Sequence, residues 1–128
     1  MEILLDTHAF IWFINGDNKL PSKPLKLIKK IENRCFVSIA TIWEIAIKYS
    51  LGRLELTKNF DDILKIMLNN KFEILPITFE HIQKLIELEY IHRDPFDRII
   101  ISQGIVENLQ ILSKDENFKK YTDNIIWE

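Results

Sequence analysis

Four acidic residues lie far apart in the chain: Asp6, Glu44, Asp97 and Asp115. Asp6 and Asp115 follow predicted strands, whereas Glu44 lies within a predicted helix and Asp97 at the start of one. Acids at the carboxyl ends of parallel strands can converge in one crevice. Two carboxylates ~4 Å apart repel by roughly 1–4 kcal/mol, so a cluster of four needs a cation to be tolerated. Hard oxygen ligands select Mg²⁺ or Mn²⁺ over zinc. The pattern therefore points to metal-dependent phosphodiester chemistry.

Each acid also has a purely structural interpretation. Asp6 and Asp115 are both placed to cap a following helix, and Glu44 would be unremarkable if it faced solvent. However, Glu44 lies in an almost wholly apolar stretch, 42–51, where a surface helix would normally carry several charges. One shared site explains all four positions more economically than four separate coincidences.

The third acid of the set has two candidates. Asp94 is a good N-cap, with Pro95 at the first helical position. Asp97 lies on the same helix face as Ile100 and Ile101, which directs its carboxylate back toward the sheet edge. One helix start needs only one capping acid, so we prefer Asp97 for metal contact and Asp94 for the cap, and Asp94 stays an alternative.

Length and composition fit a single globular domain spanning 1–128. A chain of 128 residues buries about two-thirds of its unfolded surface, and no apolar run approaches the roughly 20 residues that a bilayer requires. The single cysteine, Cys35, excludes a disulfide framework and is expected to be a buried packing residue. The net charge of −2 argues against a protein that simply coats phosphates, but bound metal reverses the local sign at a nuclease site. With no secretory signal visible, we expect a cytoplasmic protein.

The elements that must position these acids alternate between strands and helices. Short apolar runs predict strands at 2–5, 35–38, 72–75, 109–113 and 124–127. Helical spacing predicts helices after the breaker cluster 20–24 and at 39–51, 60–68, 79–89 and 95–108. Strands that alternate with helices of this length form crossover units, which predicts an α/β fold with a parallel sheet and three layers.

In this order, the motifs resemble those of the PIN-domain nucleases and, within them, the VapC-type toxins of bacterial toxin–antitoxin pairs. The matching segments cover the chain from end to end: 4–9, 37–48, 51–54, 92–98 and 112–115. The resemblance implies a three-layer PIN-like fold, in which a central parallel sheet of about four or five strands is flanked by helices and the acids gather at its carboxyl edge.

The resemblance also implies a metal-dependent endoribonuclease, commonly acting on tRNA or ribosomal RNA. By position, Asp6, Glu44, Asp97 and Asp115 match the catalytic acids, with Asp6, Asp97 and Asp115 as metal ligands for Mg²⁺ or Mn²⁺. Attack by metal-activated water would leave 5′-phosphate and 3′-hydroxyl ends. Three further residues are candidates for the site: Asp94, Ser113 and Thr7.

Basic residues and histidines near the acids are less informative. Four basic residues are candidates for contact with RNA phosphates, although each is equally well explained as a surface charge or an ion-pair partner: Lys48, Arg53, Arg93 and Arg98. The three histidines, His8, His81 and His92, have no obvious pairing, so we assign none of them to catalysis.

An apolar surplus at 10–14 and 39–51 exceeds what a small core requires, which predicts a partner surface. The resemblance implies a homodimer that is neutralised by a cognate antitoxin lying in a hydrophobic groove. A PIN-type RNA-processing nuclease without an antitoxin and a non-catalytic interaction module are the alternatives. A receiver domain would need paired acids after the first strand, and a haloacid-dehalogenase-type phosphatase would need an Asp-x-Asp motif; 6–8 provides neither.

Overall fold

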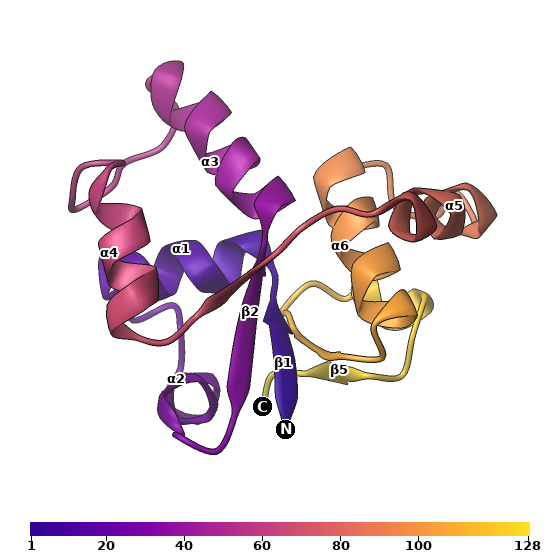
Figure 1. Ribbon diagram of the computed structural model, residues 1–128, viewed down its shortest axis with the longest axis horizontal. Helices are drawn as coiled ribbons and strands as arrows, with labels where there is room; N and C mark the ends of the chain where they lie inside the picture. Colours follow the sequence, from indigo (N-terminus) through magenta and orange to yellow (C-terminus); the bar gives the residue numbers. More distant parts are fainter.

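A five-stranded, fully parallel sheet forms the middle layer of the computed structural model, which describes residues 1–128 (Figure 1). In chain order the strands are β1 (Glu2–Leu5), β2 (Arg34–Ser38), β3 (Glu73–Leu75), β4 (Gln110–Leu112) and β5 (Ile125–Ile126). The helices are α1 (Thr7–Asn15), α2 (Ser22–Lys29), α3 (Ile39–Ser50), α4 (Asp62–Asn69), α5 (Phe79–Glu87) and α6 (Pro95–Val106), followed by a 3₁₀ turn, η1 (Phe118–Lys120). The expected α/β fold is confirmed.

The central strand β1 is buried on both faces, as a parallel sheet between two helical layers requires. Ile3 and Leu5 pack toward α1, α2 and α4, whereas Leu4 packs on the opposite face toward α6. Burying one such side chain stabilises the fold by roughly 1.5–3 kcal/mol. Cys35 of β2 lies in the first of these cores, where burial raises the pKa of its thiol to about 11, so it is the expected packing residue.

The strand order β3-β2-β1-β4-β5 creates a switch point between β1 and β4. The chain first extends the sheet on one side of β1 and then returns to extend it on the other, so the connections leaving β1 and β4 diverge. A crevice therefore opens outside the carboxyl ends of these two strands. Helix α6 packs tightly against β4, where Gly104 lies so close to Ile111 that an added Cβ would overlap that side chain.

Helix α2 differs most clearly from the sequence prediction, and several other boundaries shift by one or two residues. Helix α2 begins at Ser22, inside the expected breaker cluster, because Pro24 occupies the first turn, where a missing backbone N–H costs no helical hydrogen bond. The same helix ends at Lys29, so Ile31 is 80% exposed and does not continue the apolar face. No helix combines the length and apolar character that crossing a bilayer requires.

The apolar surplus divides between the core and the surface. Phe10, Ile11 and Ile14 of α1 are buried, so the expectation of a partner surface at 10–14 is wrong: α2 and α4 cover this stretch. On α3, by contrast, Trp43 is 60% exposed and lies in a row of exposed apolar side chains. The residues of this row are Ile39, Trp43, Ile47 and Leu51.

Candidate active site

Asp6 follows β1 directly and is both a helix cap and a buried acid. Its Oδ1 accepts a hydrogen bond from the backbone N–H of Ala9 at 2.8 Å, which caps α1. Its Oδ2 accepts a hydrogen bond from the Ser113 hydroxyl at 2.6 Å. The structural and the functional interpretations of Asp6 are therefore compatible, because the cap holds the carboxylate rigidly at the strand end.

Ser113 joins the two strand ends across the switch point. Besides donating to Asp6, its Oγ accepts the backbone N–H of Asp115 at 3.1 Å. Asp115 in turn uses Oδ1 to accept the N–H of Asn117 at 2.9 Å, which fixes the turn after β4. A hydroxyl at position 113 is thus the group that aligns Asp6 with the segment carrying Asp115.

Glu44 enters the site from α3 and is 5% exposed, so the solvent-facing interpretation does not hold. Its Oε2 pairs with the Lys48 ammonium at 2.7 Å, one helical turn along. Its Oε1 is buried and has no hydrogen-bond partner. An unpaired buried carboxylate oxygen costs free energy, so this atom is placed to accept from a group that the protein itself does not provide.

The competition between Asp94 and Asp97 is resolved by their hydrogen bonds. Asp94 Oδ1 accepts the N–H groups of Phe96 and Asp97 at 2.9 and 3.0 Å, so Asp94 is the N-cap of α6. Asp97 makes no capping bond, and its Oδ2 contacts Nε2 of His92 at 2.7 Å. Asp97 therefore has no part in the cap, and its assignment to the metal site stays a prediction.

Charge repulsion connects the four acids into one electrostatic group. Burial raises the pKa of Asp6 to about 6; the hydrogen bonds from Ser113 and Ala9 oppose this, and the charges of Asp115 and Glu44 add to it. Burial likewise raises the pKa of Asp97 to about 6, with further increases from Asp94 and Asp6 and an opposing hydrogen bond from His92. The site thus holds more negative charge than its own hydrogen bonds stabilise.

This donor set fits a hard divalent cation. It offers carboxylate oxygens from β1, α3, α6 and the segment after β4, and it includes a buried oxygen without a partner. Asp97, Asp115 and His92 each present one ligand atom, and the three atoms lie within 4.8 Å of one another. Oxygen-rich sites of this kind suit Mg²⁺ and Mn²⁺.

His92 is the site residue that sequence reasoning missed. It lies five residues before Asp97, in the connection between α5 and α6, where neither helical nor strand spacing fixes the direction of a side chain. Its Nε2 is also 3.8 Å from Oδ2 of Asp115. Only the three-dimensional course of this connection brings the ring against two of the acids.

Of the four basic candidates, two remain exposed and two are occupied within the protein. Arg53 and Arg93 are exposed, and Lys48 pairs with Glu44. Arg98 is only 8% exposed, and its guanidinium donates to backbone carbonyls of the α5–α6 connection and to the Tyr121 hydroxyl. Arg98 is thus a structural residue, contrary to the expectation that it contacts RNA.

Thr7, a further candidate from the sequence, lies beside the site rather than in it. It is buried, and its hydroxyl lies 3.1 Å from the hydroxyl of Thr41, which joins α1 to α3.

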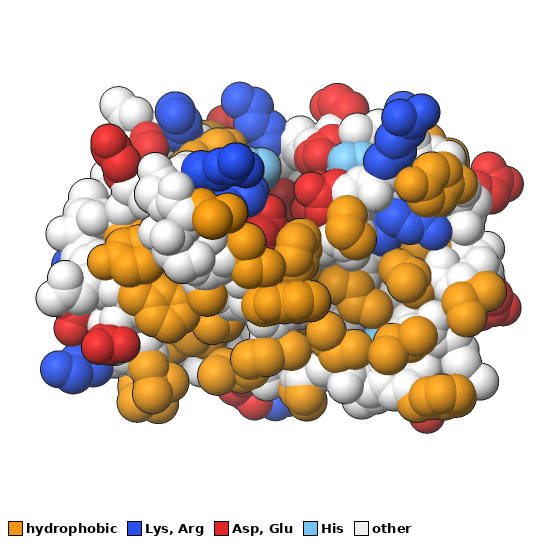
Figure 2. Space-filling view, turned by 90° about the horizontal axis from the view of Figure 1, so that it is seen from above, with side chains coloured by type: hydrophobic (Ala, Val, Ile, Leu, Met, Phe, Trp, Pro, Cys, Tyr) orange, Lys and Arg blue, Asp and Glu red, His pale blue; other side chains and the backbone are white.

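In the view onto the carboxyl edge of the sheet, acidic and histidine side chains gather in a hollow that borders a broad apolar surface (Figure 2). The site is therefore open to a large ligand on one side and flanked by apolar groups on the other.

Comparison with known proteins agrees with this architecture. The sequence profile of the PIN domain matches residues 3–124. No curated protein sequence matches the chain closely enough to show a relationship. The chain belongs to the PIN domain family, since the matched segment covers nearly its whole length.

Solved structures share the fold across their full length. One chain in the structure of VapBC2 from Rickettsia felis bound to a DNA fragment from its promoter gives a TM-score of 0.73 at 22% identity. The match covers 100% of this chain and 98% of that one. For a toxin–antitoxin complex from Klebsiella pneumoniae the TM-score is 0.67 at 13% identity, with 97% and 95% covered. For VapBC-1 from nontypeable Haemophilus influenzae it is 0.66 at 15% identity, with 100% and 97% covered.

Proposed function

We propose that this PIN-domain protein is a metal-dependent endoribonuclease that acts in the cytoplasm as the toxin of a toxin–antitoxin pair. Its substrate is a structured RNA of the tRNA or ribosomal RNA class, and its cofactor is Mg²⁺ or Mn²⁺. The observation that carries the proposal is the meeting of four acids from four separate elements around one hollow, two of them with a pKa raised to about 6. Of the four acids, only Glu44 is paired with a lysine or arginine, so carboxylate charge is left over for a ligand.

The hydrogen bonds of the site residues suggest a different role for each of them. Asp6, Asp97 and Asp115 would hold the cation, which lowers the pKa of a bound water and stabilises charge on phosphate oxygens. Ser113 keeps the Asp6 carboxylate at a fixed angle. Glu44 would accept a hydrogen bond from the attacking water through Oε1, the oxygen without an internal partner. The RNA 2′-hydroxyl is not needed as a nucleophile, so the products would carry 5′-phosphates.

Contacts with the RNA substrate would come from basic side chains that are not already paired within the protein. Arg53 and Arg93 are exposed at the end of α3 and just before α6, the two helices that flank the acids. Lys48 is half-buried and already paired to Glu44, so it would act mainly by limiting the negative charge of the site. Guanidinium groups suit this role because they bind phosphate oxygens in a bidentate manner.

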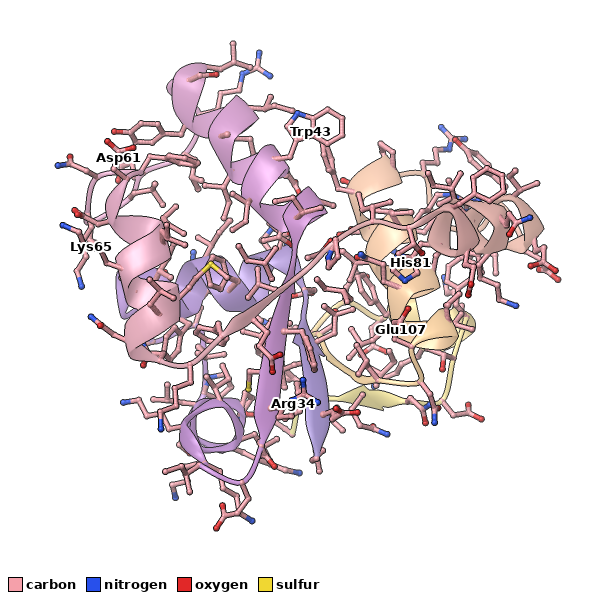
Figure 3. All side chains as sticks on the ribbon, viewed as in Figure 1. Arg34, Trp43, Asp61, Lys65, His81 and Glu107 are labelled. Carbon is pink, nitrogen blue, oxygen red and sulfur yellow. The ribbon has the colours of Figure 1, made fainter.

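The proposed protein partner is an antitoxin segment with an apolar face and a basic residue. The similarity to toxin–antitoxin complexes supports it. Trp43 extends from α3 toward α6 and stacks edge-on against Phe96 at 5.2 Å, so an apolar bridge borders the acids (Figure 3). A segment lying on this bridge would place a cation over the site. The remaining apolar surface of α3 and α5 would serve a homodimer.

The decisive experiment compares RNA ends after brief induction of the wild type and of Asp6→Asn. We expect new 5′-phosphate ends with the wild type and none with Asp6→Asn. The matched control is Glu73→Gln, which removes an acid from the opposite end of the sheet, next to Arg34, and should cleave like the wild type.

Two results would contradict the proposal. Products with 2′,3′-cyclic phosphates would exclude the metal-activated water route. Cleavage that persists in Asp6→Asn would exclude the acid cluster as its origin. Growth arrest on induction, relieved by co-expression of a small neighbouring gene, separates the toxin from an RNA-processing nuclease without an antitoxin.

A further inference from the structure

The connection that carries His92 is held in place through its backbone. The Tyr121 hydroxyl accepts the N–H groups of Ile91 and His92 at 3.0 and 2.8 Å and donates to the Glu89 carbonyl at 2.7 Å. The Arg98 guanidinium donates to the carbonyls of Glu89 and His92 at 3.0 and 3.3 Å. The backbone at His92 is therefore held in place independently of any hydrogen bond that the ring makes.

The ring is also held from the side. It packs against Phe118 with the ring centres 6.3 Å apart, and the side chain is only 16% exposed. In this setting Nε2 faces the acids, 2.7 Å from Oδ2 of Asp97 and 3.8 Å from Oδ2 of Asp115. The nitrogen thus occupies the space between two carboxylates that approach from different elements.

These separations match those of donors that share one ion. Two donors bound at right angles at about 2.1 Å from an ion lie about 3 Å apart. The three ligand atoms of His92, Asp97 and Asp115 are all within 4.8 Å of one another, so small side-chain adjustments suffice. In the metal-free protein Nε2 is hydrogen-bonded to Oδ2 of Asp97, and metal binding would replace this bond, with the imidazole carrying its hydrogen on Nδ1 and presenting the Nε2 lone pair.

We propose that Nε2 of His92 is a direct ligand of the divalent cation, together with Asp97 and Asp115. The site is then a mixed nitrogen–oxygen centre, which favours Mn²⁺ over Mg²⁺, because imidazole is a good ligand for transition metals and a poor one for magnesium. This inference rests on the proposed metal-dependent function and adds a histidine to the aspartates of its cation site.

The test is pulsed electron paramagnetic resonance of the Mn²⁺-loaded protein, which detects nitrogen bound to the ion. We expect the wild type to show coupling to one imidazole nitrogen, with a change of pattern when histidine is labelled with ¹⁵N. His92→Gln should lose the coupling and weaken Mn²⁺ binding roughly 10-fold, while the Mg²⁺ affinity changes much less. The readout does not depend on knowing the RNA target.

The matched control is His8→Gln. His8 is exposed on α1, and its ring contacts Trp12 at 5.8 Å rather than any acid, so this variant should keep the nitrogen coupling. His92→Gln leaves the backbone anchors to Tyr121 and Arg98 intact, which circular dichroism and a thermal melt check. The ¹⁵N comparison in the wild type needs no variant.

The outcomes separate this inference from the function on which it rests. Bound Mn²⁺ without nitrogen coupling, or coupling that survives in His92→Gln, overturns the role of His92 and leaves a carboxylate site in place. Absence of Mn²⁺ and Mg²⁺ binding in the wild type, or binding that is unchanged in Asp97→Asn, overturns both proposals.

Discussion

The two ends of the central sheet place acidic side chains in opposite electrostatic environments. At the amino end, Arg34 (labelled in Figure 3) pairs with Glu2 at 2.7 Å and with Glu73 at 2.9 Å, and all three side chains are exposed. The hydrogen bond and charge of Arg34 lower the pKa of Glu73. At the carboxyl end, burial and neighbouring acids raise the pKa of Asp6 and Asp97 to about 6.

The contrast shows that proximity of acids alone does not distinguish a functional cluster. Glu2 and Glu73 share one arginine across three strands, and each acid of this group has a cation in contact. At the other end, the buried guanidinium of Arg98 donates only to carbonyls and to a hydroxyl. Cations are present near both ends, but at the carboxyl end only Glu44 is paired with one, Lys48, whereas both acids at the amino end contact Arg34.

The largest effect expected from this contrast is on RNA cleavage. Asp6→Asn should lower the initial rate at least ~100-fold, because it removes a carboxylate that would bind the catalytic cation. Glu73→Gln should change the rate less than about twofold. Rates are measured with RNA in excess at saturating Mn²⁺, and equal rates for the two variants would show that the two ends do not differ in function.

The pH dependence of stability should have opposite signs at the two ends. Asp6 has a pKa of about 6 in the folded protein against an ordinary 3.8, so its stabilising contribution is present below pH ~4 and is lost as the pH rises through 6. At 1.36 kcal/mol per pKa unit, the free energy of unfolding of the metal-free wild type should fall by roughly 3 kcal/mol relative to that of Asp6→Asn between pH 4 and 7. Urea unfolding at several pH values checks this.

The same series in saturating Mn²⁺ provides the control. The bound cation should remove most of the loss above pH 6, because it interacts favourably with the charged form of the Asp6 carboxylate. For Glu73 the pKa is lowered, so its contribution is present at neutral pH and is lost on acidification. A wild type that gains stability relative to Asp6→Asn as the pH rises would contradict the electrostatic account of the site.

Arginine-to-lysine substitutions compare the buried and the exposed guanidinium directly. Arg98→Lys should lower the free energy of unfolding by about 2 kcal/mol, because one ammonium cannot satisfy the carbonyls of Leu85, Leu88, Glu89 and His92 together. It should also weaken Mn²⁺ binding by releasing the loop that carries His92. A stability within 0.5 kcal/mol of the wild type would show that water replaces these bonds at no cost.

The smallest effect is expected at the exposed amino end. Arg34→Lys should leave the free energy of unfolding unchanged within the error of the measurement, since the Arg34 side chain is 58% exposed and its ion pairs are screened by solvent. Cleavage and Mn²⁺ binding should stay at wild-type values. A loss of activity would reveal a connection between the two ends that the hydrogen bonds do not suggest.

The acids at strand ends could be predicted because the signal is local. Apolar runs located β1 and β4, and parallel strands must present Asp6 and Asp115 at the same edge. The α/β order followed in the same way from alternating element types. For Asp94 and Asp97, knowing that one helix start needs one cap was enough to choose between them.

The rest depended on contacts that no short window of sequence contains. The directions of His92 and Arg98 follow from hydrogen bonds to Tyr121, which lies 29 and 23 residues further along the chain. The burial of 10–14 depends on α2 and α4 covering α1, which apolar composition alone does not specify. From the sequence, Arg98 beside the acidic motif was therefore a candidate for phosphate contact, although in the structure it supports the α5–α6 connection through hydrogen bonds.

The hydrogen bond between Asp6 and Ser113 links positions 107 residues apart. Pairings so distant in sequence form late, since the chain must first close a large loop. A growing polypeptide that has not yet produced β4 lacks both the serine and Asp115, and its first acid has no partner across the crevice. Under the proposed function, a nascent chain therefore cannot cleave RNA before β4 and the segment that follows it have been made.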